Sequence, residues 1–146
     1  MNLRFLSAAA IAVSVSASAF AKTGWSDDLD KGLAKAKAEN KQVIVDFTGS
    51  DWCIWCKRLD DEIFSKAKFK EYVKDKYVLV EVDFPQVKRL PAAKQKANEA
   101  LGEKFKIQGY PTVVVLDAEG NETSRLGYVE GGPEKFIAEL EKKAKK

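Results

Sequence analysis

Residues 42–56 read QVIVDFTGSDWCIWC, and this stretch decides the fold of the chain. The segment 42–48 is rich in β-branched and aromatic residues, is too short for a helix and is almost continuously apolar, as a buried central strand should be. Gly49 and the polar residues after it end the strand. A helix is predicted to begin at Trp52 or Cys53. The only two cysteines of the 146-residue chain therefore lie at a strand-to-helix junction.

On either side of this junction, hydrophobic periodicity and turn residues predict an α/β domain. The first two strands are separated by helices and should be parallel through a right-handed crossover, whereas the last two should form an antiparallel hairpin. A four-stranded mixed sheet with helices on both faces is expected. The predicted elements are a helix over 27–39 capped by Ser26, the strand 42–48, a helix from 52 or 53 to 63 that bends at 64–65 and continues to 75, a strand over 77–84, a helix over 92–105, a strand over 112–116, a turn at 117–121, a strand over 123–128 and a helix over 134–143.

Residues 1–21 are predicted to be a secretory signal peptide, followed by one domain over 22–146. Arg4 precedes an apolar run, and the segment ends in Ala-Phe-Ala at 19–21, the small-x-small pattern found before a cleavage site. The apolar run is shorter than the ~20 residues of a membrane-spanning helix, and an uncleaved anchor is the alternative. We therefore expect a periplasmic or secreted protein that has no membrane association after cleavage.

Composition argues against several classes of function. Removal of Arg4 with the signal peptide leaves 24 basic and 22 acidic side chains, a balance that does not predict nucleic-acid binding. The chain has no histidine, which is the commonest metal ligand and general base. No metal site and no cofactor are predicted. The 125 residues of 22–146 suffice for one domain with one core, and we expect a monomer.

The two cysteines, Cys53 and Cys56, are three positions apart. A disulfide that closes so short a loop gains little from loop-closure entropy, so a purely structural bridge is a poor explanation of the pair. A pair that opens and closes by thiol–disulfide exchange is a better one. Two thiolates could instead hold a soft metal ion, but a closed zinc site needs four ligands. Covalent haem attachment at C-x-x-C-H is another alternative, although Lys57 stands in place of the histidine.

The place of Cys53 at the start of a helix predicts that it is the nucleophile. Unsatisfied backbone N–H groups and the helix macrodipole favour its thiolate over the thiol, whose pKa is ordinarily ~8.5. Lys57, four residues later, adds a cation to the same face, and Asp51 acts against both effects. Cys56, one turn along, is expected to be more buried and to be the resolving thiol that attacks a mixed disulfide at Cys53.

Three aromatic residues and a proline are candidate substrate-binding residues. The motif GYPT at 109–112 places Pro111 directly before a core strand, where a missing N–H is unfavourable. A cis Tyr110–Pro111 bond beside the cysteines would expose the Tyr110 backbone to an extended substrate, and a trans turn proline is the alternative. Trp55, together with Trp52, is predicted to form an apolar collar for partner docking. The alternative is that both indoles cover the edge of the core.

These motifs resemble the thioredoxin-like superfamily over nearly the whole of 22–146. The resemblance rests on VDF at 45–47, WCIWC at 52–56 and GYPT at 109–112. The longer stretch TGSDWCIWCKRLD is similar to small exported thioredoxin-like proteins of bacteria and to the periplasmic C-terminal domain of the transmembrane thiol:disulfide interchange reductase. The resemblance implies a thioredoxin-like fold, a cis Pro111 and the first cysteine as nucleophile. It also implies that the partners are protein thiols or disulfides and an upstream redox protein.

Two acids are candidate proton acceptors for Cys56. Asp46 matches the buried acid of thioredoxin, although one extra residue separates it from the first cysteine, and Asp60 matches an acid of the interchange reductase domain. The alternatives are a structural carboxylate for Asp46 and a solvated helix acid for Asp60. The lysine that accompanies the buried acid in thioredoxin has no counterpart in VLVEVDF at 78–84, and no counterpart of thioredoxin's first strand is predicted. The dipeptide at 54–55 is Ile-Trp instead of thioredoxin's Gly-Pro, so its reduction potential does not carry over.

The sequence therefore predicts an exported thiol–disulfide oxidoreductase. A non-catalytic thioredoxin-fold chaperone or interaction module is the alternative. Both directions of electron flow fit the sequence, because the direction depends on the reduction potential of the pair relative to its partners.

Overall fold

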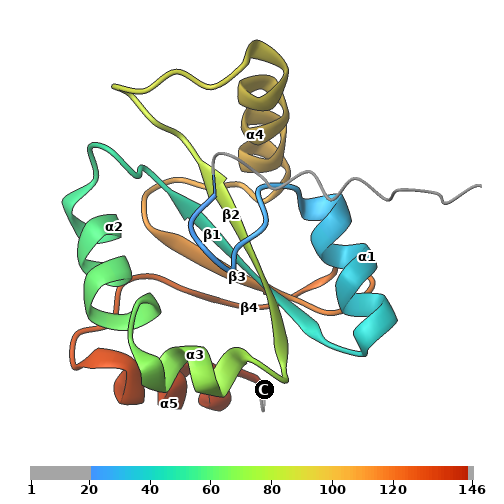
Figure 1. Ribbon diagram of the computed structural model, residues 1–146, viewed down its shortest axis with the longest axis vertical. Helices are drawn as coiled ribbons and strands as arrows, with labels where there is room; N and C mark the ends of the chain where they lie inside the picture. The colour runs from blue at the N-terminus through green and yellow to red at the C-terminus, as the bar shows by residue number, and fades with distance from the viewer. Residues whose placement is uncertain (1–20, 145–146) are drawn as a thin grey trace, which may run out of the picture.

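The computed structural model describes residues 21–144, so the predicted signal peptide, apart from its last residue, lies outside the described part of the chain. Among these residues, no helix is long and apolar enough to cross a membrane. The elements in chain order (Figure 1) are α1 Leu29–Glu39, β1 Gln42–Thr48, α2 Ile54–Leu59, the π-helical segment η1 Asp60–Phe64, α3 Ala67–Val73, β2 Tyr77–Asp83, α4 Ala92–Lys104, β3 Thr112–Leu116, β4 Glu122–Leu126 and α5 Gly132–Ala144.

The strands form one four-stranded sheet in the order β2-β1-β3-β4. β1 and β2 are parallel, whereas β1 with β3 and β3 with β4 are antiparallel. This arrangement confirms the predicted α/β fold with a four-stranded mixed sheet. It also makes β1, the strand that leads to the cysteines, a central strand with a partner on each side.

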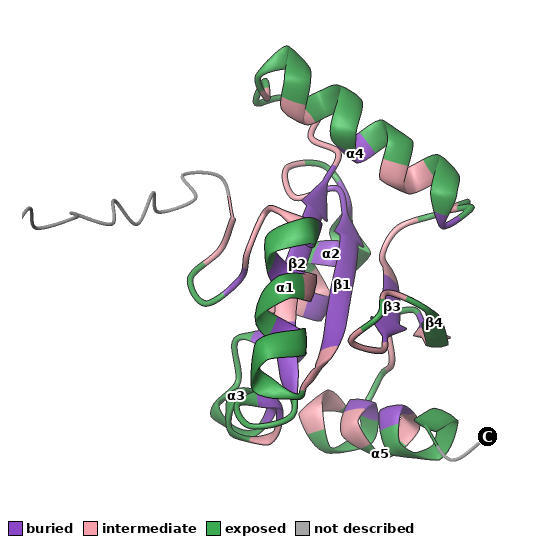
Figure 2. Ribbon diagram, turned by 90° about the vertical axis from the view of Figure 1, so that its right-hand side faces the viewer, coloured by how far each residue is buried: buried purple, intermediate pink, exposed green. Residues whose placement is uncertain are grey.

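Each face of the sheet carries its own hydrophobic core, because side chains alternate across a strand. On one face, Ile44 and Val113 pack with side chains of α2, η1, α3 and α5. On the other, Val43, Val45 and Val80 pack with side chains of α1 and α4. Helices therefore cover both faces, as predicted (Figure 1). β1 and β2 are buried along almost their whole length, whereas α4 is mostly exposed (Figure 2).

The segment before α1 lies against the outer edge of β2. The backbone N–H of Ser26 donates to Leu79 O at 2.9 Å, and the N–H of Glu81 donates to Ser26 O at 2.8 Å. The prediction that Ser26 caps the first helix is therefore wrong, since its backbone pairs with the strand. Asp28 is the cap, and its side chain accepts the N–H of Lys31 at 3.1 Å.

The helical region after the cysteines is divided into three parts. α2 ends at Leu59, η1 continues it as a π-helical segment, and α3 begins after Ser65. The predicted bend at 64–65 coincides with the junction of η1 and α3. The other element boundaries differ from the predicted ones by no more than two residues, as at the start of α5, which begins at Gly132 instead of Glu134.

Candidate active site

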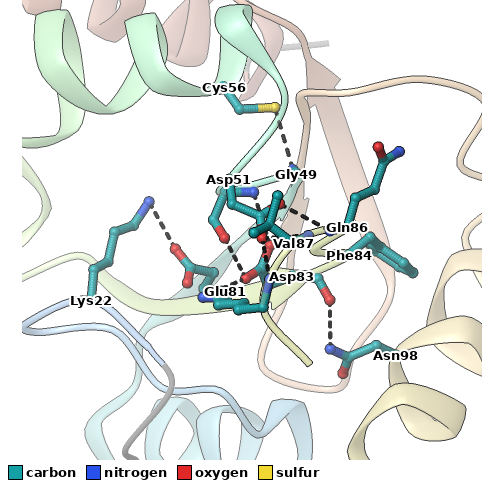
Figure 3. Close-up of polar contacts among 12 residues, drawn as sticks. Lys22, Gly49, Asp51, Cys56, Glu81, Asp83, Phe84, Gln86, Val87 and Asn98 are labelled. Atoms are coloured by element: carbon teal, nitrogen blue, oxygen red, sulfur yellow. Dashed lines mark hydrogen bonds and ion pairs between the residues drawn. The ribbon is translucent and has the colours of Figure 1, made fainter. Parts of the chain in front are cut away.

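Cys53 and Cys56 form a disulfide, with their Cα atoms 5.2 Å apart. Cys53 is the N-cap residue of α2, and its Sγ accepts the backbone N–H of Cys56 at 3.2 Å. The Sγ of Cys56 accepts the N–H of Gly49 at 3.5 Å (Figure 3). The expectation that Cys56 is the more buried of the two is wrong, because each cysteine is 5 % exposed. The bond holds both sulfurs in one environment, so burial does not distinguish their roles.

A pair of acids lies side by side on the two central parallel strands. Asp46 of β1 is in register with Glu81 of β2, and the two residues are 2 % and 7 % exposed. Asp46 is two positions from Ile44, so the period-two alternation of a strand places it on the sheet face that α2 covers. Sequence reasoning found Asp46 but missed Glu81, whose only signal was a charge between the apolar residues Val80 and Val82.

Lys22 binds this acidic pair from the segment before α1. Its Nζ lies 3.1 Å from Asp46 Oδ2, 3.2 Å from Glu81 Oε2 and 3.0 Å from Asp60 Oδ1. Figure 3 shows the lysine side chain extended toward the carboxylate of Glu81. Residues 78–84 contain no lysine, as noted from the sequence, and the lysine partner of Asp46 comes from the segment before α1 instead. Lys22 is 24 residues before Asp46, and no periodic pattern links two residues so far apart.

Burial and charge act in opposite directions on this cluster. Burial raises the pKa of the Asp46 carboxyl above its ordinary value, and the Lys22 ammonium only partly opposes that effect. Burial likewise raises the pKa of Glu81. For Lys22, burial alone would lower the pKa of its ammonium, but the surrounding carboxylates raise it overall. Within the described residues Asp46 Oδ1 has no hydrogen-bond partner, so this oxygen can accept a proton without breaking a contact.

A cavity of about 500 Å³ lies beside Cys56 and two of the three acids, Asp60 and Glu81. Lys22 and Lys57 also line it, whereas Asp46 is not among its lining residues. Asp60 lies one helical turn after Cys56, as predicted, and its backbone N–H donates to the Cys56 carbonyl. Its side chain is 45 % exposed, in contrast to the buried Asp46. The structure thus brings both predicted acids to one lysine in different environments.

On the other side of the disulfide, Asp51 binds the loop between β2 and α4. Its carboxylate accepts the backbone N–H groups of Gln86, Val87 and Lys88 at 2.8–2.9 Å (Figure 3). These bonds, led by the one from Gln86, lower the pKa of the Asp51 carboxyl. The carboxylate of Asp51 therefore binds the loop. From the sequence alone, Asp51 was expected only to oppose the stabilisation of the Cys53 thiolate.

Further polar contacts hold the same loop to the approach to α2. Ser50 donates to Asp83 through both its N–H, at 3.0 Å, and its hydroxyl, at 2.6 Å. Lys88 Nζ lies 2.9 Å from Asp83, and the Asn98 side chain donates to the Asp83 carbonyl at 2.9 Å. The loop beside the disulfide is thereby fixed from two sides.

The two predicted collar tryptophans are both exposed but are held differently. Trp52 is 40 % exposed, donates from Nε1 to the Phe84 carbonyl at 2.8 Å, and meets Tyr110 edge to face at 5.7 Å between ring centroids. Trp55 is 49 % exposed and packs on Tyr128 at 5.4 Å between centroids. Each ring packs on a partly buried tyrosine at the edge of a core, Tyr110 or Tyr128, so their positions fit both the predicted collar and the alternative that they cover the core edge.

Arg58 and Glu62 support Trp55 from the next helical turn. The Arg58 guanidinium lies 5.1 Å from the centre of the Trp55 ring and donates to Glu62 at 2.7 Å. Glu62 also accepts a hydrogen bond from the hydroxyl of Tyr128. This network holds the indole in a single position on the surface beside the disulfide.

Pro111 lies at the same end of the central strands as the cysteines. The Tyr110–Pro111 peptide bond is cis. Thr112, the next residue, is in register with Phe47 near the end of β1, the strand that leads to Cys53. Within residues 21–144, no group of Cys, Asp or Glu side chains is arranged to hold a metal ion.

Comparisons with known proteins agree with this geometry. A family model described as a thioredoxin-like domain matches residues 29–144. The chain belongs to the thioredoxin-like domain family. It is 34 % identical over 110 residues to the disulfide bond reductase DsbH of Chlamydia pneumoniae, which covers 75 % of this chain and 66 % of the relative. It is 35 % identical over 104 residues to the thiol:disulfide interchange protein DsbD of Cronobacter sakazakii, covering 71 % of this chain but only 16 % of that protein.

The thioredoxin-like fold is also found in a solved structure of a DsbH oxidoreductase. The TM-score is 0.77 at 30 % sequence identity, over 89 % of this chain and 95 % of that one. The chain thus spans nearly all of the solved DsbH structure but less than two thirds of the curated DsbD protein. The predicted thioredoxin-like fold is confirmed, and the cysteine pair lies at the helix start that the motif predicted.

Proposed function

We propose that the chain is an exported thiol–disulfide oxidoreductase, in which Cys53 and Cys56 exchange a dithiol and a disulfide with protein substrates. The observation that carries this proposal is the disulfide at the start of α2, beside a cavity that Cys56 shares with Lys22, Asp60 and Glu81. A purely structural disulfide would not require titratable groups beside Cys56. The names of the DsbH and DsbD relatives support the same reaction type.

In the reducing direction, the Cys53 thiolate attacks one sulfur of a substrate disulfide. A Cys53–substrate bond forms, and the other substrate sulfur leaves as a thiolate. Cys56 then loses its proton and attacks Cys53 Sγ, which forms the Cys53–Cys56 disulfide and releases the second substrate sulfur. The substrate gains two electrons, and the cysteine pair loses them. The oxidising direction is the reverse of these steps.

The hydrogen bond from the Cys56 N–H to Cys53 Sγ supports the role of Cys53 as nucleophile, because the same donor would stabilise its thiolate. Asp46 and Asp60 are the proposed acceptors of the Cys56 proton. Asp46 is the stronger candidate because its buried carboxyl has a raised pKa and an unpartnered oxygen. A raised pKa brings a carboxyl closer to that of the thiol it must deprotonate.

Trp52, Trp55, Tyr110 and Pro111 are the proposed substrate-binding residues. Their support is position: the two exposed indoles flank Cys53, and the Tyr110–Pro111 segment precedes β3 at the sheet edge nearest the cysteines. The proposed partners are protein thiols or disulfides and an upstream redox protein. We further propose a monomer that binds neither nucleic acid nor, after removal of residues 1–21, a membrane.

Trapping and labelling test the proposed function. Cys56→Ser should accumulate mixed disulfides through Cys53, whereas Cys53→Ser should accumulate few, and in the reduced protein Cys53 should be alkylated at lower pH than Cys56. Preferential labelling of Cys56 would reverse the two roles. Partner binding without any exchange of electrons would instead identify a non-catalytic chaperone or interaction module.

Export is tested separately by intact-mass analysis of the protein recovered from the periplasm or medium. Cleavage after Ala21 predicts a chain that begins at Lys22. Recovery of a chain that still contains residues 1–21 would contradict it.

A further inference from the structure

Among the described residues, only Lys22 forms ion pairs with all three of the acids Asp46, Asp60 and Glu81. The acids come from three elements: Asp46 from β1, Asp60 from η1 and Glu81 from β2. The lysine side chain is 22 % exposed, and its Nζ lies 4.1 Å from the centre of the Trp25 ring. Because three carboxylates and an aromatic ring surround the ammonium group, its position is defined.

The position of Lys22 is set by the short segment 22–26 that pairs with β2. Trp25 is buried in the same core as α2 and stacks on Phe64 at 4.9 Å between ring centroids. Ser26 is hydrogen-bonded to the edge of β2 on both sides of Val80. The Trp25 N–H donates to the Lys22 carbonyl at 3.0 Å, which closes a turn and directs the lysine back to the sheet.

The segment lies outside the part of the chain that defines the family. The thioredoxin-like family model begins at residue 29, seven positions after Lys22. Lys22 also directly follows the predicted cleavage point, so it would be the first residue of the mature chain. The cation of the acid cluster therefore comes from the segment that precedes the matched thioredoxin-like domain.

Charge neutralisation at the cluster depends on this one residue. The groups that face Asp46 are Lys22, Asp60, Glu81 and, two register positions along β2, Asp83, whose own cation is Lys88. Lys57 lines the cavity on the side of Cys56. Without Lys22, the buried carboxyl groups of Asp46 and Glu81 would have no ion-pair partner beside the half-exposed Asp60, and the most buried of them would retain its proton. A protonated Asp46 cannot accept the proton of Cys56.

We propose that Lys22 is a positioning residue for resolution of the mixed disulfide: it keeps Asp46 ionised, so that the carboxylate can take the Cys56 proton at neutral pH. This inference rests on the proposed oxidoreductase function. In the step concerned, the Cys56 proton passes to Asp46 and the Cys56 thiolate attacks Cys53 Sγ. The bond from Cys53 to the substrate sulfur then breaks, and that sulfur leaves with the electron pair. Lys22 neither gains nor loses a proton or electrons in this step.

The test is the pH profile of the resolving step in single-turnover reactions of the reduced full-length protein with a protein disulfide. An opposite charge within about 4–6 Å changes the pKa of a carboxyl group by roughly 1–3. Lys22→Met should therefore resolve about tenfold more slowly at pH 7, approach the wild-type rate near pH 9, and leave the first attack by Cys53 unchanged. Lys22→Arg should restore the wild-type profile.

Two further variants keep the outcome interpretable. Lys31→Met removes an exposed lysine of α1, 75 % exposed, and should match the wild type at every pH. Lys22→Gln removes the charge but keeps a hydrogen-bond donor, and serves if the methionine variant is unfolded. A uniform loss of rate at all pH values, or an unchanged profile, would overturn the role of Lys22. Absence of any exchange by the wild type would instead overturn the oxidoreductase function itself.

Discussion

Asp46 and Asp51 are five residues apart, on opposite sides of the loop that leads to the disulfide. The pKa values of their carboxyl groups are shifted in opposite directions. Asp46 is buried on β1 with Lys22 as its partner, and burial raises its pKa. Asp51 lies at the surface, accepts three backbone N–H groups, and has a lowered pKa. The same type of side chain therefore has a raised pKa at one position and a lowered pKa at the other, near one pair of cysteines.

The difference shows how burial and hydrogen bonding determine which role a carboxyl group can have. A buried carboxyl with a raised pKa and a free oxygen suits proton transfer, because its two protonation states are closer in energy at working pH. A carboxylate that accepts three backbone N–H groups is held in the charged form and suits anchoring of a loop. We expect substitutions at the two positions to affect different kinetic constants.

The largest effect is expected for Asp46→Asn. The amide cannot accept the Cys56 proton, so the resolving step should slow by ~10²-fold, the usual contribution of general-base catalysis, while the first attack by Cys53 is spared. Rapid-quench single-turnover kinetics separate the two steps. A change in the resolving rate of less than about twofold would mean that Asp46 is a structural carboxylate.

A smaller effect on a different constant is expected for Asp51→Ala. Loss of its three acceptor contacts should release the loop at 86–88, so that KM for a protein disulfide rises about fivefold, as expected for the loss of roughly 1 kcal/mol of binding. The rate with a small aromatic disulfide should stay within about twofold of the wild type. Faster hydrogen exchange at the amides of Gln86, Val87 and Lys88 would report the released loop directly.

Asp75→Ala is the matched control, since Asp75 is exposed and lies just before β2, at the end of that strand remote from the disulfide. It should change neither KM nor the exchange of the loop amides. Equal loss of activity toward the protein and the small disulfide in Asp51→Ala would show that Asp51 affects the cysteines themselves and not the loop.

A weaker kinetic effect is expected for Asp60→Asn, which sharpens the comparison because Asp60 shares Lys22 with Asp46. Its side chain is 45 % exposed, so water can replace its contacts and solvent screens its charge. The resolving rate should change by no more than about twofold. A slowing comparable to that of Asp46→Asn would identify Asp60 as the proton acceptor.

The smallest effect concerns the pH dependence of stability, where the two aspartates should act with opposite sign. The raised pKa of Asp46 means that the folded state binds its proton more tightly, so this residue costs stability as pH rises from about 4 through the folded pKa. The lowered pKa of Asp51 means that its contribution is present above about pH 4 and is lost as pH falls through the folded pKa.

Urea unfolding of the oxidised protein between pH 3 and pH 8 tests both signs. In Asp46→Asn, the urea concentration at the unfolding midpoint should decline less as pH rises above 4. In Asp51→Asn, it should decline less as pH falls below 4. The difference from the wild type should be about a few tenths molar in each case. Parallel curves for the wild type and both variants would contradict the opposite shifts.

The sequence by itself determined the elements that local patterns encode. The apolar segment 42–48 could only be a buried strand, the polar turn after it had to end that strand, and the helix that follows had to begin at the cysteines. The parallel direction of the first two strands followed from the helices between them, and the antiparallel direction of the last two followed from the hairpin turn at 117–121, so the mixed sheet was predictable. Asp46 was recognisable because a charge in a core strand requires a reason.

Only the tertiary structure decided what surrounds those residues. Lys22 reaches Asp46 across 24 residues, Glu81 joins it through the parallel register of two strands, and Asp51 binds a loop 35 residues further on. Ser26 was expected to cap a helix and instead pairs with β2. Local patterns carry the periodicity of one helix or strand, whereas contacts between segments depend on how the sheet is assembled. The lowered pKa of Asp51 depends on those contacts, whereas the raised pKa of Asp46 comes from burial and is only partly opposed by Lys22. The burial of Asp46 could be expected from its place in a core strand, but the partners of the two acids could not.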